Sequence, residues 1–334
     1  MEMQTEGIGT GSSGKMGISG STIKIIAVVA MFIDHSAAVV LARYLRGGIV
    51  AATTAGTGQI WWTENAVWYD IYDVMRGIGR LGFPIFCFLL VEGYQRTRDV
   101  RKYALRLGLF ALISEVPFDL AICGSVFHLG YQNVYFTLLL GLLALCAYGF
   151  FGKFGIEGKK DLPLPLRIGF MVTGVALPVA YVGLGMQKEG KADGIPYRAC
   201  LVCGLVIVCC LVGYGIWKGL RSVQTACMDM TALAICMTAA MYLETDYAGM
   251  GVLTITAMYL FRRWKAVAML AGCIVLCVMS LSELYAFFAI LPIALYNGKR
   301  GLKMKYFFYG FYPAHLLLLY VASVLMGLGS VTLL

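Results

Sequence analysis

Apolar segments about as long as a bilayer is thick recur from residue 23 to the C-terminus, and only short polar breaks separate them. A helix needs about 20 mainly apolar residues to cross the hydrocarbon core. The chain is also 60% hydrophobic and only 13% charged, far from the balance of a soluble globular domain. The sequence therefore predicts an all-α fold, a polytopic bundle of helices in a lipid bilayer.

The apolar runs set the expected number of helices and their bounds. They cover residues 23–45, 77–95, 101–122, 133–152, 166–187, 198–217, 226–243, 248–262, 265–281, 284–297 and 306–332. The ninth and tenth runs can also form one re-entrant pair, so we expect about 10–11 transmembrane helices. They make a single domain over residues 21–334. A stretch rich in Gly and Ser, residues 1–20, is expected to be a flexible cytoplasmic tail.

The basic residues indicate the orientation of the chain. With the N-terminus inside, the cytoplasmic breaks hold 20 of the 27 Lys and Arg residues, which is the bias that the positive-inside rule predicts. The outer breaks keep the remaining seven, among them Arg43, Arg76 and Arg80. The net charge of +9 is therefore a sign of topology, and we expect no nucleic-acid partner.

Other sequence features add little chemistry. All 11 cysteines lie in or at the ends of apolar runs, and this favours core packing over a metal or redox site. No phosphate-binding glycine loop or soluble-hydrolase motif is present in the sequence. Between the first two runs, residues 47–73 are rich in Trp and Tyr. We expect an outer loop there that either anchors in the headgroup layer or covers an external opening.

The stretch "KIIAVVAMFIDH", residues 24–35, places ionisable groups inside the first span. Such groups are costly in hydrocarbon and by default indicate function. Lys24 and His35 are eleven residues apart, so they share one helix face and lie about 16 Å apart along the axis. Asp34 points about 100° away from His35. We therefore expect its partner to come from another helix.

Further polar groups fall in other apolar runs. Glu115 and Asp119 share one face of the third run, as i and i+4 neighbours. The last run carries His315 near mid-depth, with Tyr312 one turn earlier. Each has a purely structural alternative: a hydrogen-bonded packing histidine, a polar contact between helices, or an ion pair of the acidic residues with Arg80. Lys24 can simply snorkel to the interface.

Together these residues favour acyl transfer across the membrane. Histidine can take a proton from an amine or hydroxyl near neutral pH, and a basic mouth can hold a phosphorylated donor. We expect acetyl-CoA, or another acyl-CoA, to enter from the cytosol past Lys24, with its thioester at His35. The acceptor is expected from the outer side. Two alternatives stay open, a transporter with an intramembrane His/Glu proton relay and a noncatalytic assembly protein.

The chain resembles the TraX family. The resemblance is carried by "KIIAVVAMFIDH", "GRLGFPIFCFLLVEG", "YALRLGLFALISEVPFDLA", "NVYFTLLLGLLAL", "DYAGMGVL" and "YGFYPAHLLLL", in that order. That family includes the conjugative-plasmid protein needed for N-terminal acetylation of pilin. The spacing from Lys24 to His35 also resembles the opening motif of the wider transmembrane acyltransferases. The resemblance implies a multi-pass acetyltransferase in the bacterial inner membrane, with the N-terminus in the cytoplasm.

The resemblance also implies site residues. His35 becomes the catalytic base and Lys24 its motif partner. The other positions expected at the site or in its pore are Asp34, Arg80, Asn133, Asp246, Tyr247, Tyr312 and His315. From the residues themselves we expect Glu115, Asp34 or Tyr312 to orient His35. Asn133, Arg80 or His315 would meet the thioester oxyanion. The chain departs from the pilin acetylase in its tail, its first outer loop and residues 188–198, so the acceptor stays open between pilin and a cell-surface glycan.

Overall fold

The computed structural model describes residues 17–154, 161–190 and 195–333, and their regular structure is helical apart from two isolated bridges. The elements in order are α1 (Gly20–Ser36), η1 (Ala37–Leu41), α2 (Ala42–Thr54), α3 (Gly58–Glu64), α4 (Ala66–Gly79), α5 (Gly82–Arg96), α6 (Val100–Phe118), η2 (Asp119–Cys123), α7 (Val134–Phe151), η3 (Gly152–Phe154), α8 (Leu164–Lys188), α9 (Ile195–Lys218), α10 (Leu220–Tyr242), α11 (Ala248–Leu260), α12 (Lys265–Met279), η4 (Leu281–Ala289), α13 (Ile290–Ala294) and α14 (Lys305–Leu325). The all-α prediction is confirmed.

A helix occupies each of the eleven predicted runs, but not all of these helices are long enough to cross a bilayer. Seven stretches qualify by length and composition among the described residues, namely 20–54, 66–96, 134–154, 164–188, 196–218, 220–242 and 306–325. The eighth to tenth runs form shorter apolar helices, at 248–260, 265–279 and 281–294. The chain is a multi-pass membrane protein with fewer full-length spans than the run count indicates.

The first helix is longer than its apolar run. It continues through α1, η1 and α2 as one stretch of 35 residues, and a π-helical step at η1 interrupts the α-helical register, where the Ala42 N–H bonds to the Ala37 carbonyl. Most of the predicted outer loop at residues 47–73 is helical, because it contains α3 and parts of α2 and α4. Its place outside the membrane stays a prediction. Trp61 of α3 packs so closely on Gly48 of α2 that a Cβ there would overlap the indole ring.

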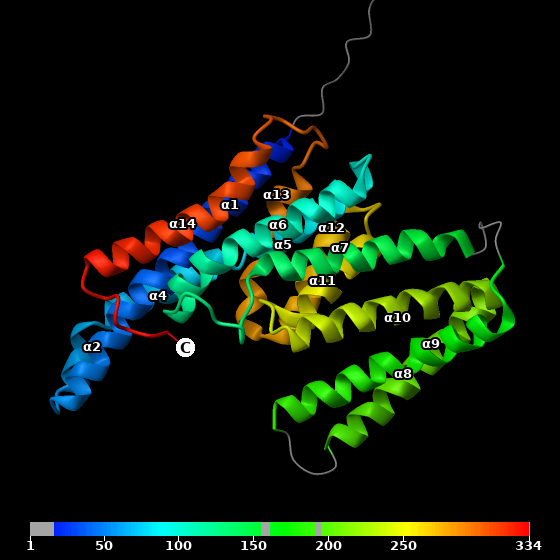
Figure 1. Ribbon diagram of the computed structural model, residues 1–334, viewed down its shortest axis with the longest axis horizontal. Coiled ribbons are helices and arrows are strands. Elements are labelled where there is room, and N and C mark those ends of the chain that lie inside the picture. The colour runs from blue at the N-terminus through cyan, green and yellow to red at the C-terminus, as the bar shows by residue number, and fades with distance from the viewer. Residues whose placement is uncertain (1–16, 155–160, 191–194, 334) are drawn as a thin grey trace, which may run out of the picture.

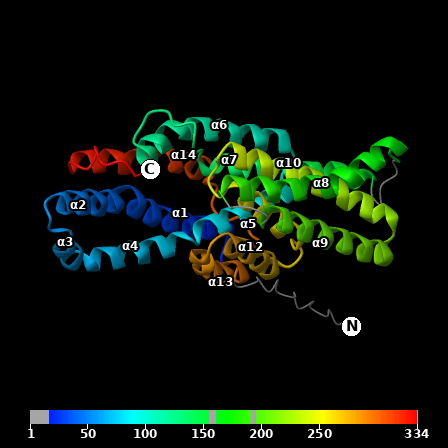
Figure 2. The same cartoon turned by 90° about the horizontal axis from the view of Figure 1, so that it is seen from below.

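The helices form a flattened bundle with a lateral extension. α1 and α14 run together along one edge, α5, α6, α7 and α11 fill the middle, and α10 carries the α8–α9 hairpin on the far side (Figures 1 and 2). The main core joins side chains such as Ile23, Phe83, Leu142, Met258 and Leu316. By contrast, the apolar stretch of α9 has no buried residues, so the site is built by the other helices.

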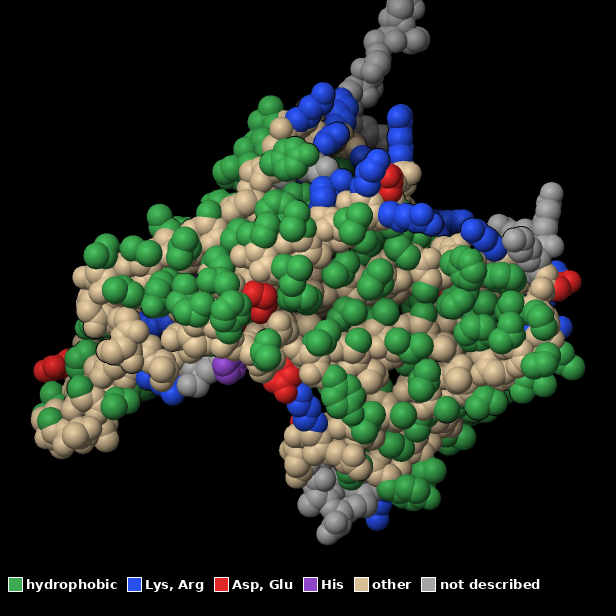
Figure 3. Space-filling view, viewed as in Figure 1, with side chains coloured by type: hydrophobic (Ala, Val, Ile, Leu, Met, Phe, Trp, Pro, Cys, Tyr) green, Lys and Arg blue, Asp and Glu red, His purple; other side chains and the backbone are tan. Residues whose placement is uncertain are grey.

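Lys and Arg side chains are concentrated along one edge of the molecule (Figure 3). They gather near the start of α1, while apolar side chains cover the flanks. Backbone hydrogen bonds on that edge join the residues just before α1 to the residues just after α13. The Ile18 N–H donates to the Leu295 carbonyl at 2.9 Å, and the Asn297 N–H donates to the Ile18 carbonyl at 3.0 Å. Residues 1–16 of the predicted tail lie outside the described residues.

Candidate functional site

Two histidines from opposite ends of the chain meet inside the bundle. His35 lies near the end of α1 and His315 in the middle of α14, and Nδ1 of His35 is 2.6 Å from Nε2 of His315. The rings are nearly parallel, at 9° with centroids 4.9 Å apart. His315 is buried, with 4% of its surface exposed. The structure thus brings together the two histidines that the sequence placed near mid-depth.

The hydrogen bonds of this pair assign the tautomers. Nδ1 of His315 lies 2.8 Å from the Phe311 carbonyl, which can only accept a hydrogen bond. The proton of neutral His315 is therefore on Nδ1, and its Nε2 must accept from Nδ1 of His35. A neutral His35 then carries its proton on Nδ1, and its Nε2 keeps a free lone pair. This is the form that a general base needs.

His35 faces a small chamber. Its wall is formed by Met31, Asp34, His35, Gly79, Gly82, Phe83, Phe86, Val134, Tyr135, Leu138, Asp246, Tyr247, Phe308 and Tyr312, around about 90 Å³. The Tyr312 ring meets the His35 ring edge-on, with centroids 5.9 Å apart. Of the predicted site residues, the chamber gathers His35, Asp34, Tyr312, Asp246 and Tyr247.

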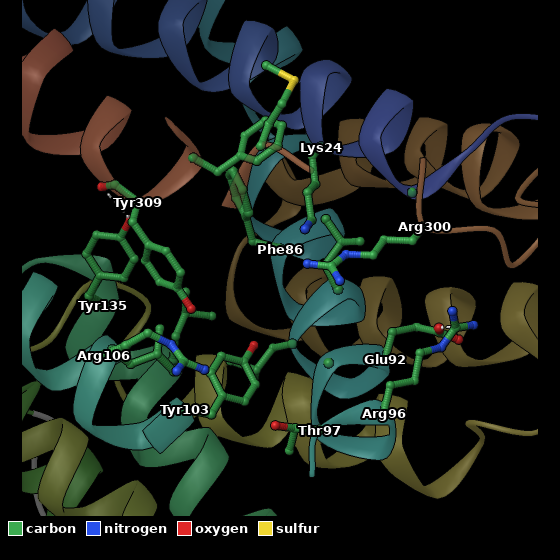
Figure 4. Close-up of a pocket in the computed structure, with 18 of the residues that line it drawn as sticks. Lys24, Phe86, Glu92, Arg96, Thr97, Tyr103, Arg106, Tyr135, Arg300 and Tyr309 are labelled. Atoms are coloured by element: carbon green, nitrogen blue, oxygen red, sulfur yellow. Dashed lines mark hydrogen bonds and ion pairs between the residues drawn. The ribbon is translucent and has the colours of Figure 1, made fainter. Parts of the chain in front are cut away.

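A larger cavity of about 660 Å³ opens on the basic edge of the molecule. Its wall includes five cationic side chains, Lys24, Arg96, Arg98, Arg106 and Arg300. Lys24 and Arg300 point into the cavity from one side and Arg106 from another (Figure 4). The volume is typical of a pocket for a small molecule or cofactor, and the charge suits an anionic ligand.

The cavity and the chamber adjoin one another. Phe86, Tyr135, Leu138 and Phe308 line both spaces. Lys24 therefore lines the large basic cavity and His35 lines the small chamber beside it, in agreement with their shared helix face. Among the described residues Lys24 has no carboxylate partner within ion-pair distance, and its Nζ lies 5.4 Å from the centroid of the Phe308 ring. Arg96, by contrast, is paired with Glu92 at 2.7 Å.

Asp34 does not orient His35. Its Oδ2 accepts from Arg76 of α4 at 2.7 Å, so the partner comes from another helix, as the helical spacing predicts. Its Oδ1 is buried and has no hydrogen-bond partner within the described part of the chain. Gly79 lies so close that a Cβ there would come within 2.2 Å of this oxygen. The contact requires glycine at position 79.

Arg80 pairs with an acidic residue that the sequence analysis did not select. Its Nη1 donates to Oε1 of Glu283 at 2.8 Å, and Glu283 is completely buried. The side chain of Tyr247 also lies close to the Arg80 guanidinium. The alternative of an ion pair between Arg80 and the acidic residues of α6 is not realised. Glu283 could have been found as the single acid between two apolar runs, "SLSELYAFF".

Glu115 and Asn133 form a contact between α6 and α7. The backbone N–H of Asn133 donates to Oε1 of Glu115 at 3.0 Å, and its side-chain amide donates to the same oxygen and to the Ala111 carbonyl. Asn133 also caps α7, because its Oδ1 accepts from the Tyr135 N–H at 3.0 Å. Neither residue lines the chamber. In this structure they hold helices together, and Glu115 does not contact His35.

Asp246 and Tyr247 reach the chamber from a tight turn between α10 and α11. Glu244, Tyr247 and Ala248 all have positive φ angles, of 51°, 62° and 41°, which are strained for residues other than glycine and often mark functional sites. The Tyr131 hydroxyl donates to Asp246 Oδ1 at 2.9 Å. The nearby Asp246 carboxylate raises the pKa of Tyr131 above its ordinary value, which keeps the phenol protonated as a donor.

A protein-family model matches most of the helices that form the site. The model of the TraX protein family matches residues 19–150 and 194–323, and these ranges include α1 and α14 with the histidine pair. The chain belongs to the TraX family. The match leaves out residues 151–193, which contain α8.

One curated relative of this TraX-family chain is similar over part of its length. It is a probable fimbrial assembly protein, FimC of serogroup H1, from Dichelobacter nodosus, and it is 30% identical over 191 residues. The match spans 52% of this chain and 65% of that protein. No solved structure matches the chain.

Proposed function

We propose that this TraX-family protein is a membrane acyltransferase that uses an acyl-CoA, in the first place acetyl-CoA, as its donor. The observation that carries the proposal is that the cavity with five cations adjoins the chamber lined by His35, because four side chains line both spaces. The nucleotide phosphates of the donor are expected at Lys24, Arg300 and Arg106. The pantetheine arm then runs past Phe86 and Phe308 toward the chamber.

His35 acts as the general base in this scheme. The acceptor nitrogen or oxygen attacks the thioester carbonyl and forms the new C–N or C–O bond, and its proton passes to Nε2 of His35. As the C–S bond breaks, the sulfur takes this proton from His35, and free coenzyme A leaves as the thiol. His315 accepts from Nδ1 of His35 throughout, and so keeps the ring in the orientation that the transfer needs. Tyr312, whose ring meets the rings of both His35 and His315 edge-on, packs against the pair.

The acceptor is expected on the other side of the membrane from the donor. The chain lies in the bacterial inner membrane with its basic edge in the cytoplasm, on the positive-inside rule. The family resemblance and the fimbrial assembly relative support a protein of a surface fibre, such as pilin, as the acceptor. A cell-surface glycan would use the same chemistry through a hydroxyl group.

Release of free thiol from acetyl-CoA tests the proposal. Purified full-length protein in detergent would be compared with His35→Ala and Lys24→Ala, with and without a short peptide that has a free N-terminus. Wild type is expected to release coenzyme A, His35→Ala to bind acetyl-CoA without turnover, and Lys24→Ala to bind it weakly. Folded wild type that neither binds nor turns over acetyl-CoA would overturn the proposal and favour a transporter.

A further inference from the structure

Arg43 is a buried cation that the acyl-transfer scheme does not use. It lies eight residues after His35 on the same continuous helix, and its surface exposure is 0%. No carboxylate pairs with it among the described residues. A buried charge is costly unless its hydrogen-bonding groups are satisfied. The sequence analysis placed Arg43 with the cations of the outer breaks, and that placement is wrong.

Three backbone carbonyls satisfy the guanidinium instead. Nη1 of Arg43 donates to the Val39 carbonyl at 2.9 Å, Nε to Val331 at 3.1 Å and Nη2 to Leu120 at 3.3 Å. The Tyr320 ring lies 5.9 Å away. One side chain thus joins the first helix, the end of the α6–η2 helix and the segment that follows α14.

Two of these carbonyls belong to π-helical turns. Val39 lies in η1 and Leu120 in η2. A π-turn disturbs the ordinary ladder of backbone hydrogen bonds and is frequent at functional sites. η1 begins two residues after His35. A change in η1 therefore alters the rotation of the helix next to the catalytic ring.

The third carbonyl ties Arg43 to the helix of the other histidine. Residues after α14 fold back toward α2 (Figure 1), and Gly47 leaves room for Val331, whose Cγ2 would be 3.0 Å from a Cβ at that position. Tyr320, which the guanidinium also meets, is five residues beyond His315 on α14. Arg43 thus contacts α14 through the Tyr320 ring and bonds to the segment after α14 through Val331, about 12 Å along the axis from His35.

We propose that Arg43 is a positioning residue that fixes the first helix against α14 and so keeps Nδ1 of His35 bonded to Nε2 of His315. Without this contact the two helices can slide or rotate relative to one another. His35 then loses its fixed tautomer, and Nε2 is no longer held toward the chamber. The catalytic consequence rests on the proposed function, but the effect on the histidine pair does not.

The test uses nitrogen-15 histidine labelling of the full-length protein in detergent micelles. The chain has only 3 histidines, and His128→Gln removes the one in a loop, so the signals of the pair can be assigned. Nitrogen chemical shifts report which ring nitrogen carries the proton. In wild type both paired rings are expected to show protonated Nδ1 and unprotonated Nε2.

Arg43→Met is the main variant, because it removes the charge and all three donors and keeps most of the volume. Arg43→Lys is the conservative second variant. It keeps the positive charge but cannot bond to all three carbonyls in the way that the guanidinium does. The matched control is Arg46→Met, since Arg46 is exposed on the same helix and bonds to the Leu333 carbonyl of the same C-terminal segment. Folding of each variant is checked by its thermal transition.

Arg43→Met is expected to mix the His35 tautomers and to lower kcat by about 10-fold to 100-fold, as a misplacement near 1 Å does. The KM for acetyl-CoA should stay within two-fold, roughly, because the donor cavity is remote from this contact. The kcat of Arg43→Lys should lie between the values of wild type and Arg43→Met, and the kcat of Arg46→Met should match that of wild type.

The two proposals fail in different ways. Folded Arg43→Met with wild-type nitrogen shifts would overturn the positioning role, even if the wild type is an active transferase. Loss of the fixed tautomer in Arg43→Met, in a protein that shows no acetyl transfer, would support the positioning role and reject the transferase. If neither Arg43 variant folds, a wild type with unfixed histidine tautomers would still overturn the role.

Discussion

His35 and His315 lie 280 residues apart in the chain and share a hydrogen bond of 2.6 Å. The bond is directional, because Nδ1 of His315 is already used by the Phe311 carbonyl. One histidine is thereby a base with a free nitrogen, and the other is its orienting acceptor. This asymmetry predicts that the two residues respond differently to substitution.

His35→Ala should abolish turnover, whereas His315→Ala should lower it by a smaller factor. A general base contributes about 10²-fold to 10⁴-fold, and loss of its orienting partner leaves the base in place but less ordered. Thiol release from acetyl-CoA measures both, with His128→Ala as the control, since that histidine lies in the loop between η2 and α7. Equal losses in the two variants, with equal donor binding, would contradict the assigned roles.

Lys24→Met should raise the KM for acetyl-CoA on the order of ten-fold and leave kcat nearly unchanged. One hydrogen bond to a charged group contributes about 1.5 kcal/mol or more, and about 1.4 kcal/mol is a factor of ten. Lys102→Met is the matched control, because Lys102 is exposed and pairs with Asp99 outside the cavity. A fall in kcat with unchanged KM would place Lys24 at the reacting centre.

Glu283→Gln should destabilise the folded protein, because it leaves the guanidinium of Arg80 without its buried counter-charge. Breaking a buried ion pair by removing one partner costs about 3–5 kcal/mol. The comparison is Asp161→Asn, which breaks the exposed pair of Asp161 with Arg221 and should cost about 0–1 kcal/mol. Thermal transitions in one detergent give the ranking, and similar transitions for both variants would reject the structural role of Glu283.

Gly79→Ala should disturb the chamber without unfolding the bundle. The added Cβ would come within 2.2 Å of Asp34 Oδ1, so either α4 moves or the bond between Asp34 and Arg76 breaks. Turnover is expected to fall several-fold with donor KM unchanged. Gly310→Ala serves as the control, because nothing lies within 4 Å of a Cβ there. Wild-type turnover in Gly79→Ala would show that Asp34 has no part in shaping the site.

Asn133→Ala separates a structural role from an oxyanion role. It removes the α7 cap and the two side-chain bonds to α6 but keeps the backbone bond to Glu115, and each unsatisfied buried group costs about 1–3 kcal/mol. We expect a lower thermal transition with turnover reduced less than ten-fold, roughly, at a temperature where the variant is folded. If turnover instead fell by about 10²-fold to 10³-fold and the thermal transition stayed unchanged, Asn133 would be a donor to the oxyanion.

Part of the site could be predicted from local periodicity. Lys24 and His35 share a face because helical geometry fixes their relation over eleven residues, and the same geometry turns Asp34 about 100° away from His35. Neither conclusion needs a partner helix. The structure agrees with both, since Lys24 and His35 line two adjoining cavities and Asp34 pairs with Arg76. The expectation that Asp34 can orient His35 is therefore the weaker of the two sequence predictions for that residue, and it is wrong.

Pairings between helices could not be predicted in this way. Apolar runs can be packed in many orders in a bilayer, because lipid solvates their outer faces equally well. Periodicity therefore leaves open whether Glu115 orients His35, pairs with Arg80 or makes a polar contact with another helix. In the folded protein Glu115 accepts a hydrogen bond from Asn133, and Arg80 forms an ion pair with Glu283.

The sequence by itself determined that this chain is an all-α membrane protein with its ionisable groups at mid-span, because hydrocarbon demands long apolar helices and tolerates few charges. Only the tertiary structure decided how far those helices extend and what their polar groups bind. The buried Arg43 shows the difference, since its acceptors are carbonyls from three distant segments. Backbone carbonyls exist at every residue, so no sequence pattern marks which of them a buried cation will find.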